Sequence, residues 1–300
     1  MTGHVAGNQE NVRLSRRRLL AWITAAALAD SAGAASASSS LKAIQKRIGG
    51  RLGVHVLDSQ SGKRIGFDDG ARFAMASTFK VPLVAALLWQ VDHGAFPLEH
   101  TLPIARAQLL ANSPVLEPRI AAGATEMSVR DLCAAAITFS DNTAANVLLA
   151  GMGGPQGLTS FARSLGDEVT RFDRTETELN SNTPDDPRDT TTPRAMADLL
   201  LKIFTQNVLA LTSRALLIDW MTASRIGLER VRAGLPHDWQ AADKPGTGAN
   251  GAFNDLVITW PPERRPILIA VYMSGSTLDA RQLAAAHADI GRLVAREKWP

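Results

Sequence analysis

Segments with the pattern of β-strands lie near both ends of this chain and enclose a long helical middle. Residues 51–67 alternate apolar and polar positions around the turn-rich "DSQSG", which predicts a hairpin. "AFNDLVITWP" and "RRPILIAVYMSG", residues 252–261 and 264–275, predict two more strands joined by a short turn. The pattern between about residues 77 and 221 is helical. We therefore expect an α/β two-domain fold, in which an antiparallel sheet flanked by helices is built from both chain ends and an all-helical domain is inserted.

The domain boundaries follow from the same patterns. We expect the α/β domain to comprise residues 38–72 and 222–300, and the all-helical domain to comprise residues 73–221. Amphipathic helices are expected close to residues 41–50 and 277–299, and Thr192 before Pro193 predicts a helix start. The polar segment "RTETELNSNTPDDPRDTT", which begins at Arg174, is long for a loop in a compact domain, and such loops are usually functional or disordered.

The first forty residues have the layout of an export signal. Three arginines precede a short apolar run, residues 19–28, and small residues follow it. Residues 15–20, "SRRRLL", resemble a twin-arginine signal. A basic tail with a membrane anchor is the alternative, but the run is too short to span a bilayer easily. We expect cleavage between Gly33 and Ser38, export by the twin-arginine route, and a periplasmic or secreted protein without a stable membrane anchor.

Charge and cysteine content exclude several kinds of function. Residues 1–37 carry four arginines against two acidic residues, so most of the chain's net charge of +3 belongs to the predicted signal. The remaining chain therefore gives no compositional support for nucleic-acid binding. A single cysteine, Cys133, allows no intrachain disulfide and no cysteine cluster. The six histidines form no recognisable ligand pair, so we expect neither a metal nor a cofactor.

"AMASTFKVP" places Ser77 and Lys80 three residues apart at the start of a predicted helix. Residues with this spacing share a helix face, so the amine can meet the hydroxyl and take its proton if burial lowers the amine's pKa. The spacing alone is weak evidence, because Ser39 and Lys42 have it too.

Three further polar motifs each allow a structural and a functional interpretation. In "FSDNTAAN", Ser140 and Asp141 could cap a helix, or Ser140 could shuttle a proton while Asn142 holds a substrate. In "RTETELN", Glu176 and Asn180 could be solvated loop residues, or could grip a water molecule if the loop folds over the serine. Lys244 in "DKPGTG" could be a surface lysine on an edge strand, or part of a catalytic Lys-Thr-Gly strand with proline in the threonine position.

The order and spacing of these four motifs resemble those of the class A serine β-lactamases, which carry Ser-x-x-Lys, Ser-Asp-Asn and Lys-Thr-Gly motifs. The resemblance extends over nearly the whole chain after the predicted signal, through "RFAMASTFKVP", "SDNTAANVLL", "RTETELN" and "ADKPGTGANGAFND". It implies the β-lactamase/transpeptidase-like fold and hydrolysis of the β-lactam ring of penicillins and cephalosporins, and therefore antibiotic resistance. The expected partners are small β-lactam molecules, and the expected state is a monomer.

The resemblance also implies catalytic roles. Ser77 would attack the β-lactam carbonyl, with its own backbone N–H and that of Thr247 as the oxyanion hole. Either Lys80 or Glu176 would be the base for acylation, and the choice stays open. Ser140, beside Lys244, would deliver a proton to the departing nitrogen. Glu176 and Asn180 would activate the water that releases the acyl group.

Substrate binding and loop closure are implied in the same way. Asn142 would bind the acylamide side chain, and Lys244 and Arg230 would bind the carboxylate, although Arg225 and Arg232 lie close to Arg230 in sequence. The further residues expected to line the substrate site are Asn112, Gly246, Thr247 and Asn180. The polar segment would be the family's omega loop, at about residues 174–189, closed by an Arg174–Asp189 ion pair.

The chain departs from the family pattern at several positions. Pro245 replaces a threonine that would bond the substrate carboxylate, Asn112 replaces an aromatic residue, and Ile226 replaces a threonine or serine. These changes predict an altered substrate preference or slower turnover. Ala76 and Gly248 stand where a carbapenem-hydrolysing branch has a disulfide, so that disulfide is absent. Cys133 matches a cysteine that is bridged in some relatives, but the position of its partner is Val84 in this chain, so a buried free thiol is expected.

Three other functions are compatible with parts of this pattern. A penicillin-binding peptidase or β-lactam sensor would share the fold but generally lacks a deacylating glutamate such as Glu176. A non-catalytic cell-wall-binding module would keep the four motifs without using them. A serine-dependent glutaminase shares the Ser-x-x-Lys chemistry, but the predicted signal and omega loop argue against it.

Overall fold

The computed structural model of this protein describes residues 37–300. The predicted export signal and its twin-arginine motif therefore lie outside the described residues, apart from Ala37. No helix among residues 37–300 combines the length and the apolar character needed to cross a membrane.

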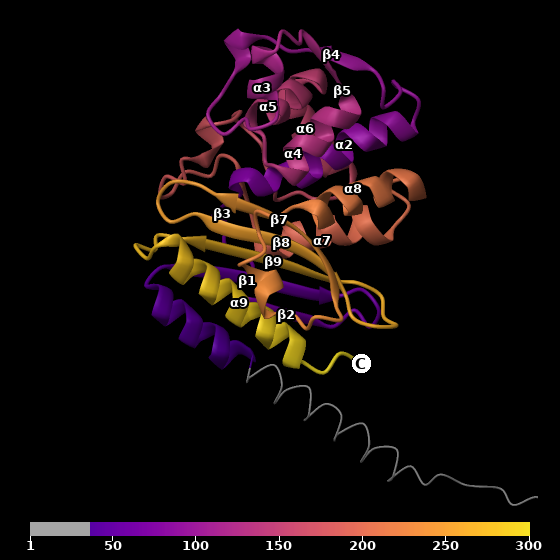
Figure 1. Cartoon of the computed structure of the whole chain (residues 1–300). Coiled ribbons are helices and arrows are strands. Elements are labelled where there is room, and N and C mark those ends of the chain that lie inside the picture. The colour runs from indigo at the N-terminus through magenta and orange to yellow at the C-terminus, as the bar shows by residue number, and fades with distance from the viewer. Residues whose placement is uncertain (1–36) are drawn as a thin grey trace, which may run out of the picture.

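A five-stranded antiparallel sheet is assembled from both ends of the chain, as the sequence predicted. Its strand order is β2-β1-β9-β8-β7, so the N-terminal hairpin pairs with the C-terminal strands through β1 and β9 (Figure 1). Arg51 lies opposite Ser274 and Asp58 opposite Ile267 across that pair. The strands are β1 (Arg51–Asp58), β2 (Arg64–Phe67), β7 (Gln240–Thr247), β8 (Phe253–Trp260) and β9 (Ile267–Ser274).

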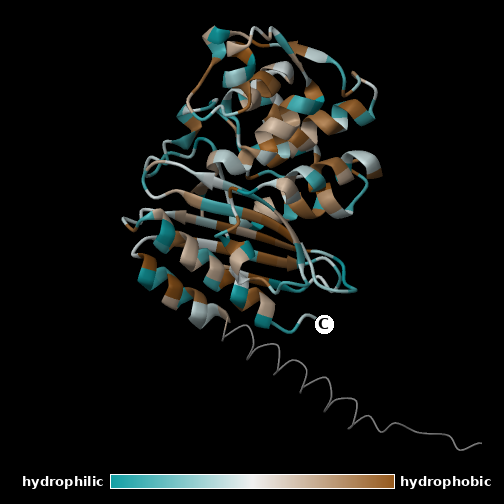
Figure 2. Cartoon of the chain, in the orientation of Figure 1, coloured by the Kyte–Doolittle hydropathy of each residue, from teal (hydrophilic) through white to brown (hydrophobic). Residues whose placement is uncertain are grey.

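Both faces of this sheet are buried, and strand alternation assigns each side chain to one of two cores. Val54, Val56 and Val271 pack on one face with the N-terminal helix, residues 37–48, and with α9 (Ala280–Arg296). Leu57 and Tyr272 belong to the other core, which continues into the helical part. Figure 2 shows hydrophobic residues along the central strands and on the helix sides that face them.

The inserted helical part forms the upper lobe of Figure 1 around the buried helix α2 (Lys80–Asp92). The sequence predicted a wholly helical insertion, but two short β pairs also occur in it and join its loops. They are β3 (Phe73–Ala74) with β6 (Thr190–Thr191), and β4 (Thr101–Pro103) with β5 (Glu126–Ser128). The other elements of the lobe are η1 (Ala76–Phe79), η2 (Arg106–Gln108), α3 (Leu116–Ala121), α4 (Val129–Thr138), α5 (Asn142–Gly151), α6 (Gly154–Ser164) and η3 (Glu178–Asn180).

Two helices connect this lobe to the sheet. Thr192 caps α7 (Pro193–Thr205) by accepting a hydrogen bond from the Ala195 N–H, as predicted from the Thr-Pro pair. α7 packs against β1 and β9, whereas α8 (Leu211–Ala223) packs against β7 and α4. Part of the predicted helical range therefore covers the sheet, because the apolar stripe of α7 faces the same core as Tyr272. After α8, the short turn η4 (Val231–Gly234) leads to β7.

Candidate active site

Ser77 lies in the turn η1, and Lys80 begins the helix α2 that follows it. The Lys80 Nζ lies 3.0 Å from the Ser77 Oγ, so the three-residue spacing brings amine and hydroxyl together. Ser77 is 9% exposed and Lys80 is fully buried. Ser39 and Lys42, which have the same spacing, are both exposed on the N-terminal helix. Burial and surroundings, rather than spacing, distinguish the two pairs.

The Lys80 amine is the centre of a buried polar network. Its Nζ lies 2.9 Å from the Glu176 Oε1, and it donates to the Asn142 Oδ1 at 2.7 Å. It also contacts the backbone oxygen and the Oγ of Ser140, at 2.9 and 3.2 Å. Burial lowers the pKa of the Lys80 amine, and the Glu176 carboxylate opposes this shift. The network can therefore move a proton among the amine, the serine and the carboxylate.

Glu176 connects the polar loop, residues 174–189, to Ser77. Its Oε1 accepts a hydrogen bond from the Ser77 Oγ at 3.3 Å, and its Oε2 accepts one from the Asn180 Nδ2 at 2.5 Å. Each carboxylate oxygen thus faces a different partner, one at the serine and one on the loop. The polar loop does fold over Ser77, which was the condition for its functional interpretation.

Asn146 holds the backbone of Glu176, and sequence reasoning did not single it out. Its Oδ1 accepts from the Glu176 N–H at 2.9 Å, and its Nδ2 donates to the Glu176 carbonyl oxygen at 2.8 Å. Asn146 ends the motif "FSDNTAAN" and lies one helical turn after Asn142 on α5. This spacing was the available signal, because residues four apart share a helix face.

The two ends of the polar loop, residues 174–189, are joined by an ion pair and by backbone hydrogen bonds. The Arg174 Nε lies 2.6 Å from the Asp189 Oδ2. The Asp189 Oδ1 also accepts the N–H groups of Asp173 and Arg174, at 2.8 and 2.9 Å. The carboxylate of Asp189 is therefore hydrogen bonded through both oxygens, which fixes the ends of the segment that carries Glu176.

The sequence left open whether Ser140 and Asp141 cap a helix or whether Ser140 takes part in proton transfer, and the structure gives the two residues different partners. Asp141 caps α5 through the Ala144 N–H and also accepts from the N–H groups of Val115 and Leu116. The Ser140 Oγ instead accepts from the Lys244 Nζ at 3.0 Å as well as from Lys80. Burial, followed by the charge of Lys80, lowers the pKa of Lys244 well below its ordinary value.

Strand β7 forms the opposite wall of the site, and it is an edge strand. The Gly248 N–H donates to the Ala252 carbonyl, and hydrogen-bonded pairs alternate along an antiparallel ladder. Pro245 and Thr247, opposite Asp255 and Phe253, therefore occupy positions whose backbone N–H points away from β8. The proline removes no ladder hydrogen bond, and the Thr247 N–H points off the open edge.

Gly246 allows β7 to lie directly against the turn that carries Ser77. A Cβ atom at this position would lie 2.9 Å from the Met75 carbonyl oxygen and 3.1 Å from the Thr78 backbone nitrogen. Real Cβ atoms hardly ever approach other atoms so closely. The absence of a side chain at Gly246 therefore allows the short distance between β7 and the turn that carries Ser77.

Arg230 lies behind Thr247 rather than open to solvent, with 6% of its surface exposed. Its Nη1 donates to the carbonyl oxygens of Gly246 and Asn254, at 3.0 and 2.6 Å, and its Nη2 donates to the Thr247 Oγ1 at 2.7 Å. The guanidinium stacks on the Phe253 ring at 3.6 Å. Of its sequence neighbours, Arg232 pairs with Asp243 at 2.8 Å, and Arg225 is exposed.

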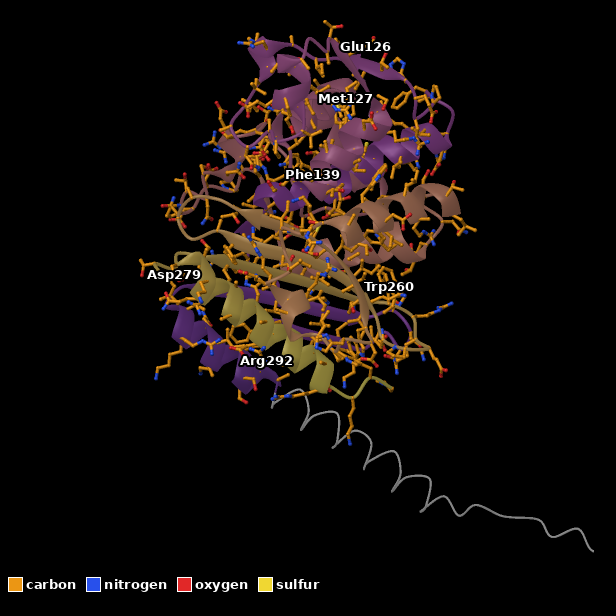
Figure 3. The ribbon with its side chains drawn as sticks, in the orientation of Figure 1. Glu126, Met127, Phe139, Trp260, Asp279 and Arg292 are labelled. Carbon is orange, nitrogen blue, oxygen red and sulfur yellow. The ribbon has the colours of Figure 1, made fainter. Side chains whose placement is uncertain are left out.

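Two of the residues that depart from the family pattern, Asn112 and Ile226, are exposed, whereas Pro245 is buried in β7. Asn112 has a φ of 58° and donates from its Nδ2 to the Ser140 carbonyl oxygen at 3.2 Å. Ile226 is 45% exposed and Phe139 is 51% exposed. Figure 3 shows Phe139 where the helical lobe meets the sheet. Cys133, on α4, is a buried free thiol, which confirms the prediction.

Among residues 37–300, no three or more histidine, cysteine, aspartate or glutamate side chains are placed to hold a metal ion.

Comparisons with known proteins agree on one family. A profile described as "Beta-lactamase enzyme family" matches residues 36–297. The Beta-lactamase L2 of Stenotrophomonas maltophilia is 42% identical over 272 residues, which are 90% of this chain and 89% of the relative. The Beta-lactamase CTX-M-97 of Escherichia coli is 40% identical over 258 residues, covering 85% and 88% of the two chains.

Solved structures of β-lactamases have the same architecture as this chain. An ancestral class A β-lactamase superimposes with a TM-score of 0.84 at 50% identity, over 86% of this chain and 98% of that one. A β-lactamase from Xanthomonas campestris pv. campestris gives a TM-score of 0.85 at 41% identity, over 88% and 97%. The fold expected from the resemblance is thus confirmed.

Proposed function

This chain belongs to the β-lactamase enzyme family as a class A serine β-lactamase, and we propose that it hydrolyses penicillins and cephalosporins through an acyl-enzyme on Ser77. The observation that carries the proposal is the contact of one hydroxyl with two possible bases. The Ser77 Oγ lies 3.0 Å from the Lys80 Nζ and 3.3 Å from the Glu176 Oε1. A hydroxyl so placed can lose its proton as it attacks the ring carbonyl.

The oxyanion that forms during attack needs donors fixed in advance. The backbone N–H groups of Ser77 and Thr247 supply them in this proposal. Support comes from the position of Thr247 in the ladder, whose N–H points off the open edge of β7. Gly246 supports the same arrangement, because its lack of a side chain lets β7 approach the serine turn.

Ring opening also requires a proton for the departing nitrogen. The Ser140 Oγ accepts hydrogen bonds from Lys80 and Lys244, so its own hydrogen is directed toward the cleft. Ser140 donates that hydrogen to the nitrogen, and one of the two lysines restores it. Asn142, which holds the Lys80 amine through its Oδ1, also binds the acylamide side chain of the substrate through its Nδ2 in the family-derived assignment.

Glu176 and Asn180 then carry out deacylation. The carboxylate takes a proton from a water molecule that attacks the acyl carbon, and the Asn180 amide orients that water. Asn146 and the Arg174–Asp189 pair keep the carboxylate in position. A peptidase or sensor that stops at the acyl-enzyme stage would have no need of this arrangement.

The substrate carboxylate is bound by Lys244 and by the Thr247 hydroxyl. Because the Thr247 Oγ1 accepts a hydrogen bond from Arg230, its own hydrogen is available to donate to an anion. Arg230 therefore acts through Thr247 as a positioning residue. This assignment replaces the direct arginine clamp that the resemblance implied.

We also propose that the protein works as an exported monomer in the periplasm or outside the cell. Support for export comes from residues 15–20, "SRRRLL", followed by a short apolar run and small residues. A β-lactam hydrolase outside the cytoplasm would destroy the antibiotic before it reaches its targets, and so confer resistance.

The test is turnover of a chromogenic cephalosporin, followed by mass spectrometry of the Glu176→Ala variant. We expect hydrolysis by the unmodified protein and a trapped acyl adduct on Ser77 in the variant. Glu178→Ala is the matched control, because Glu178 is exposed on the same loop, and it should leave turnover intact. A stable adduct without turnover in the unmodified protein would point instead to a β-lactam sensor.

A further inference from the structure

Asn254 is a fully buried polar residue to which the proposed reaction assigns no role. It lies on β8 directly opposite Gly246 of β7. Side chains that lie directly opposite each other in an antiparallel pair project to the same face of the sheet. Gly246 has no side chain to project there, and the Asn254 amide reaches the backbone just before Ser77. Asn254 therefore connects the sheet to the segment that leads into the serine turn.

The amide group of Asn254 is bonded to backbone atoms of two separate segments. Its Nδ2 donates to the carbonyl oxygens of Ala74 and Met75, at 2.9 and 3.0 Å. Its Oδ1 accepts from the Met273 N–H of β9 at 3.2 Å. A backbone N–H can only donate and a carbonyl oxygen can only accept, so these partners fix the orientation of the amide. The side chain thereby ties the segment before Ser77 to strands β8 and β9.

Met75 is held from other directions as well. Its carbonyl oxygen accepts from the Thr78 Oγ1 at 2.8 Å and from the Thr78 N–H at 3.3 Å. The Thr78 hydroxyl in turn lies 3.2 Å from the hydroxyl of Tyr272. The Met75 N–H donates to the Asp189 carbonyl oxygen at 3.0 Å. Met75 is thus bonded to the sheet, to the serine turn and to the end of the polar loop, residues 174–189.

Ala76, between Met75 and Ser77, has an uncommon backbone conformation. Its φ is 46°, in the left-handed region that residues with a side chain rarely adopt. Such a conformation costs energy and persists only where the surrounding structure holds it. The peptide group that follows Ala76 carries the Ser77 N–H, which is one of the proposed oxyanion donors. The direction of that N–H therefore depends on how firmly the residue before Ala76 is held.

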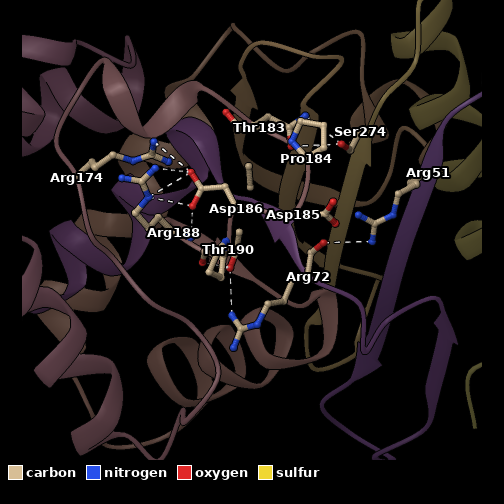
Figure 4. Close-up of a pocket in the computed structure, with 13 residues that line it drawn as sticks. Arg51, Arg72, Arg174, Thr183, Pro184, Asp185, Asp186, Arg188, Thr190 and Ser274 are labelled. Atoms are coloured by element: carbon tan, nitrogen blue, oxygen red, sulfur yellow. Dashed lines mark hydrogen bonds and ion pairs between the residues drawn. The ribbon is translucent and has the colours of Figure 1, made fainter.

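Packing on the loop side leaves space beside the same segment. Ala74 and Thr190, which are paired in β3 and β6, border a cavity of about 490 Å³ (Figure 4). Atoms that face a void lack dispersion contacts on that side. The hydrogen bonds that Asn254 donates from the sheet side therefore carry more of the restraint on this segment.

We propose that Asn254 is a positioning residue for the reaction, which acts through the Met75 carbonyl oxygen to fix Ser77 and its backbone N–H. The inference rests on the proposed function, because it concerns the same serine. Without the Asn254 amide, the buried carbonyl oxygens of Ala74 and Met75 lose this donor, and the turn is free to relax. A shift of the nucleophile by about 1 Å is enough to slow a reaction by about 10²-fold.

The test compares Asn254→Leu with Thr259→Val. Leucine is similar to asparagine in size and shape but has no donor. Thr259→Val is the matched control, because the buried Thr259 Oγ1 donates to the Gln240 carbonyl oxygen at 2.8 Å near the opposite end of β8. Each variant removes buried hydrogen bonds of the same strand, so each should lower the Tm, by about 2 to 6 °C.

Phenylboronic acid gives a readout of the serine that does not require turnover. Its boron bonds to a serine oxygen and becomes a tetrahedral anion, as the attacked carbonyl carbon does, while the serine proton is released to solvent. Well below the Tm, Asn254→Leu should bind it at least about tenfold more weakly than the unmodified protein, and Thr259→Val within about twofold. The kcat/KM for a chromogenic cephalosporin should fall by about 10²-fold in Asn254→Leu and stay within about twofold in the control.

A purely structural role predicts a different result. Full boronic acid affinity and turnover in Asn254→Leu, with only a lowered Tm, would overturn the proposal. If Asn254→Leu does not fold, Thr78→Val takes another donor from the Met75 carbonyl oxygen and should weaken boronic acid binding by about threefold or more, and unchanged binding would overturn the proposal equally.

The two readouts also separate this proposal from the proposed function. If the unmodified protein binds the boronic acid but hydrolyses no β-lactam, the proposed function fails, and the affinities of the variants still decide the role of Asn254. Failure of the unmodified protein to bind the boronic acid would overturn the present proposal whatever its turnover.

Discussion

The two sides of the candidate active site, the helical part and the sheet, differ in how tightly their side chains are held. On the helical wall, Lys80 and Glu176 are buried, and each has several hydrogen-bond or ion-pair partners. Pro245, Ile226 and Asn112 depart from the family pattern, and the last two are exposed. Proton transfer needs distances fixed to a fraction of an ångström, whereas binding of a substrate anion can be shared among several donors. We therefore expect this enzyme to keep the chemistry of its family while its substrate recognition differs.

Ser77→Ala should have the largest effect on turnover, because it removes the hydroxyl of the proposed nucleophile. We expect kcat/KM for a chromogenic cephalosporin to fall by at least about 10⁴-fold, with no acyl adduct by mass spectrometry. Ser39→Ala is the matched control, since Ser39 has a lysine at the same spacing but is exposed. A loss of activity in the control, or an adduct in Ser77→Ala, would contradict the assignment.

Asn146→Ala tests whether turnover depends on the position of Glu176 as well as on its carboxylate. The variant removes both hydrogen bonds to the Glu176 backbone, and a displaced base should lower kcat by about 10²-fold. Acyl-enzyme should accumulate during turnover, as seen by quench and mass spectrometry. Asn207→Ala, at an exposed position after α7, is the control. A purely structural effect of Asn146→Ala would lower the Tm without accumulation of acyl-enzyme.

A double-mutant cycle tests the sheet wall. Arg230→Gln and Thr247→Val should each raise KM for a penicillin by about tenfold, the cost of one hydrogen bond to a charged group. If Arg230 acts through Thr247, the double variant should be no worse than either single variant. Arg225→Gln, on the exposed neighbour, should leave KM unchanged. Independent, multiplicative effects would show that the arginine contacts the substrate directly.

Pro245→Thr should have the smallest effect and the opposite sign. The proline occupies a position at which a backbone N–H would point away from β8, so a threonine can replace it without altering the hydrogen bonds between β7 and β8. The added hydroxyl should lower KM for penicillins by about fivefold, the value of one modest hydrogen bond. Steady-state kinetics with benzylpenicillin will measure this, and an unchanged or higher KM would refute the idea of a weakened clamp.

Much of the active site was predictable from short segments of sequence. Ser77 and Lys80, or Ser140 and Asn142, lie within a few residues of each other, so local spacing already limits how they can be arranged. The alternation of Val54 and Val56 and the late strands likewise indicated a sheet from both chain ends. Helix and strand periods report which side chains share a face, and that information is local.

Partners brought together from distant segments could not be predicted in this way. Ser77 and Glu176 are 99 positions apart, and the tie between Asn146 and Glu176 joins two different elements. Helix periodicity predicts that Asn146 and Asn142 share one face of α5, but not that this face contacts the loop of residues 174–189. Likewise, the sequence suggested Arg230 as a carboxylate ligand, and only its stacking on Phe253 and its bond to Thr247 indicated a supporting position.

The sequence by itself determined the fold, the family and the set of reactive side chains, because these depend on residue type, order and local spacing. The tertiary structure decided which groups the Lys80 amine contacts, where a backbone N–H at position 245 would have pointed, and that Arg230 lies behind Thr247. Those features depend on how the strands are registered and how the two lobes pack. Such packing is set by the whole core at once, and no single segment encodes it.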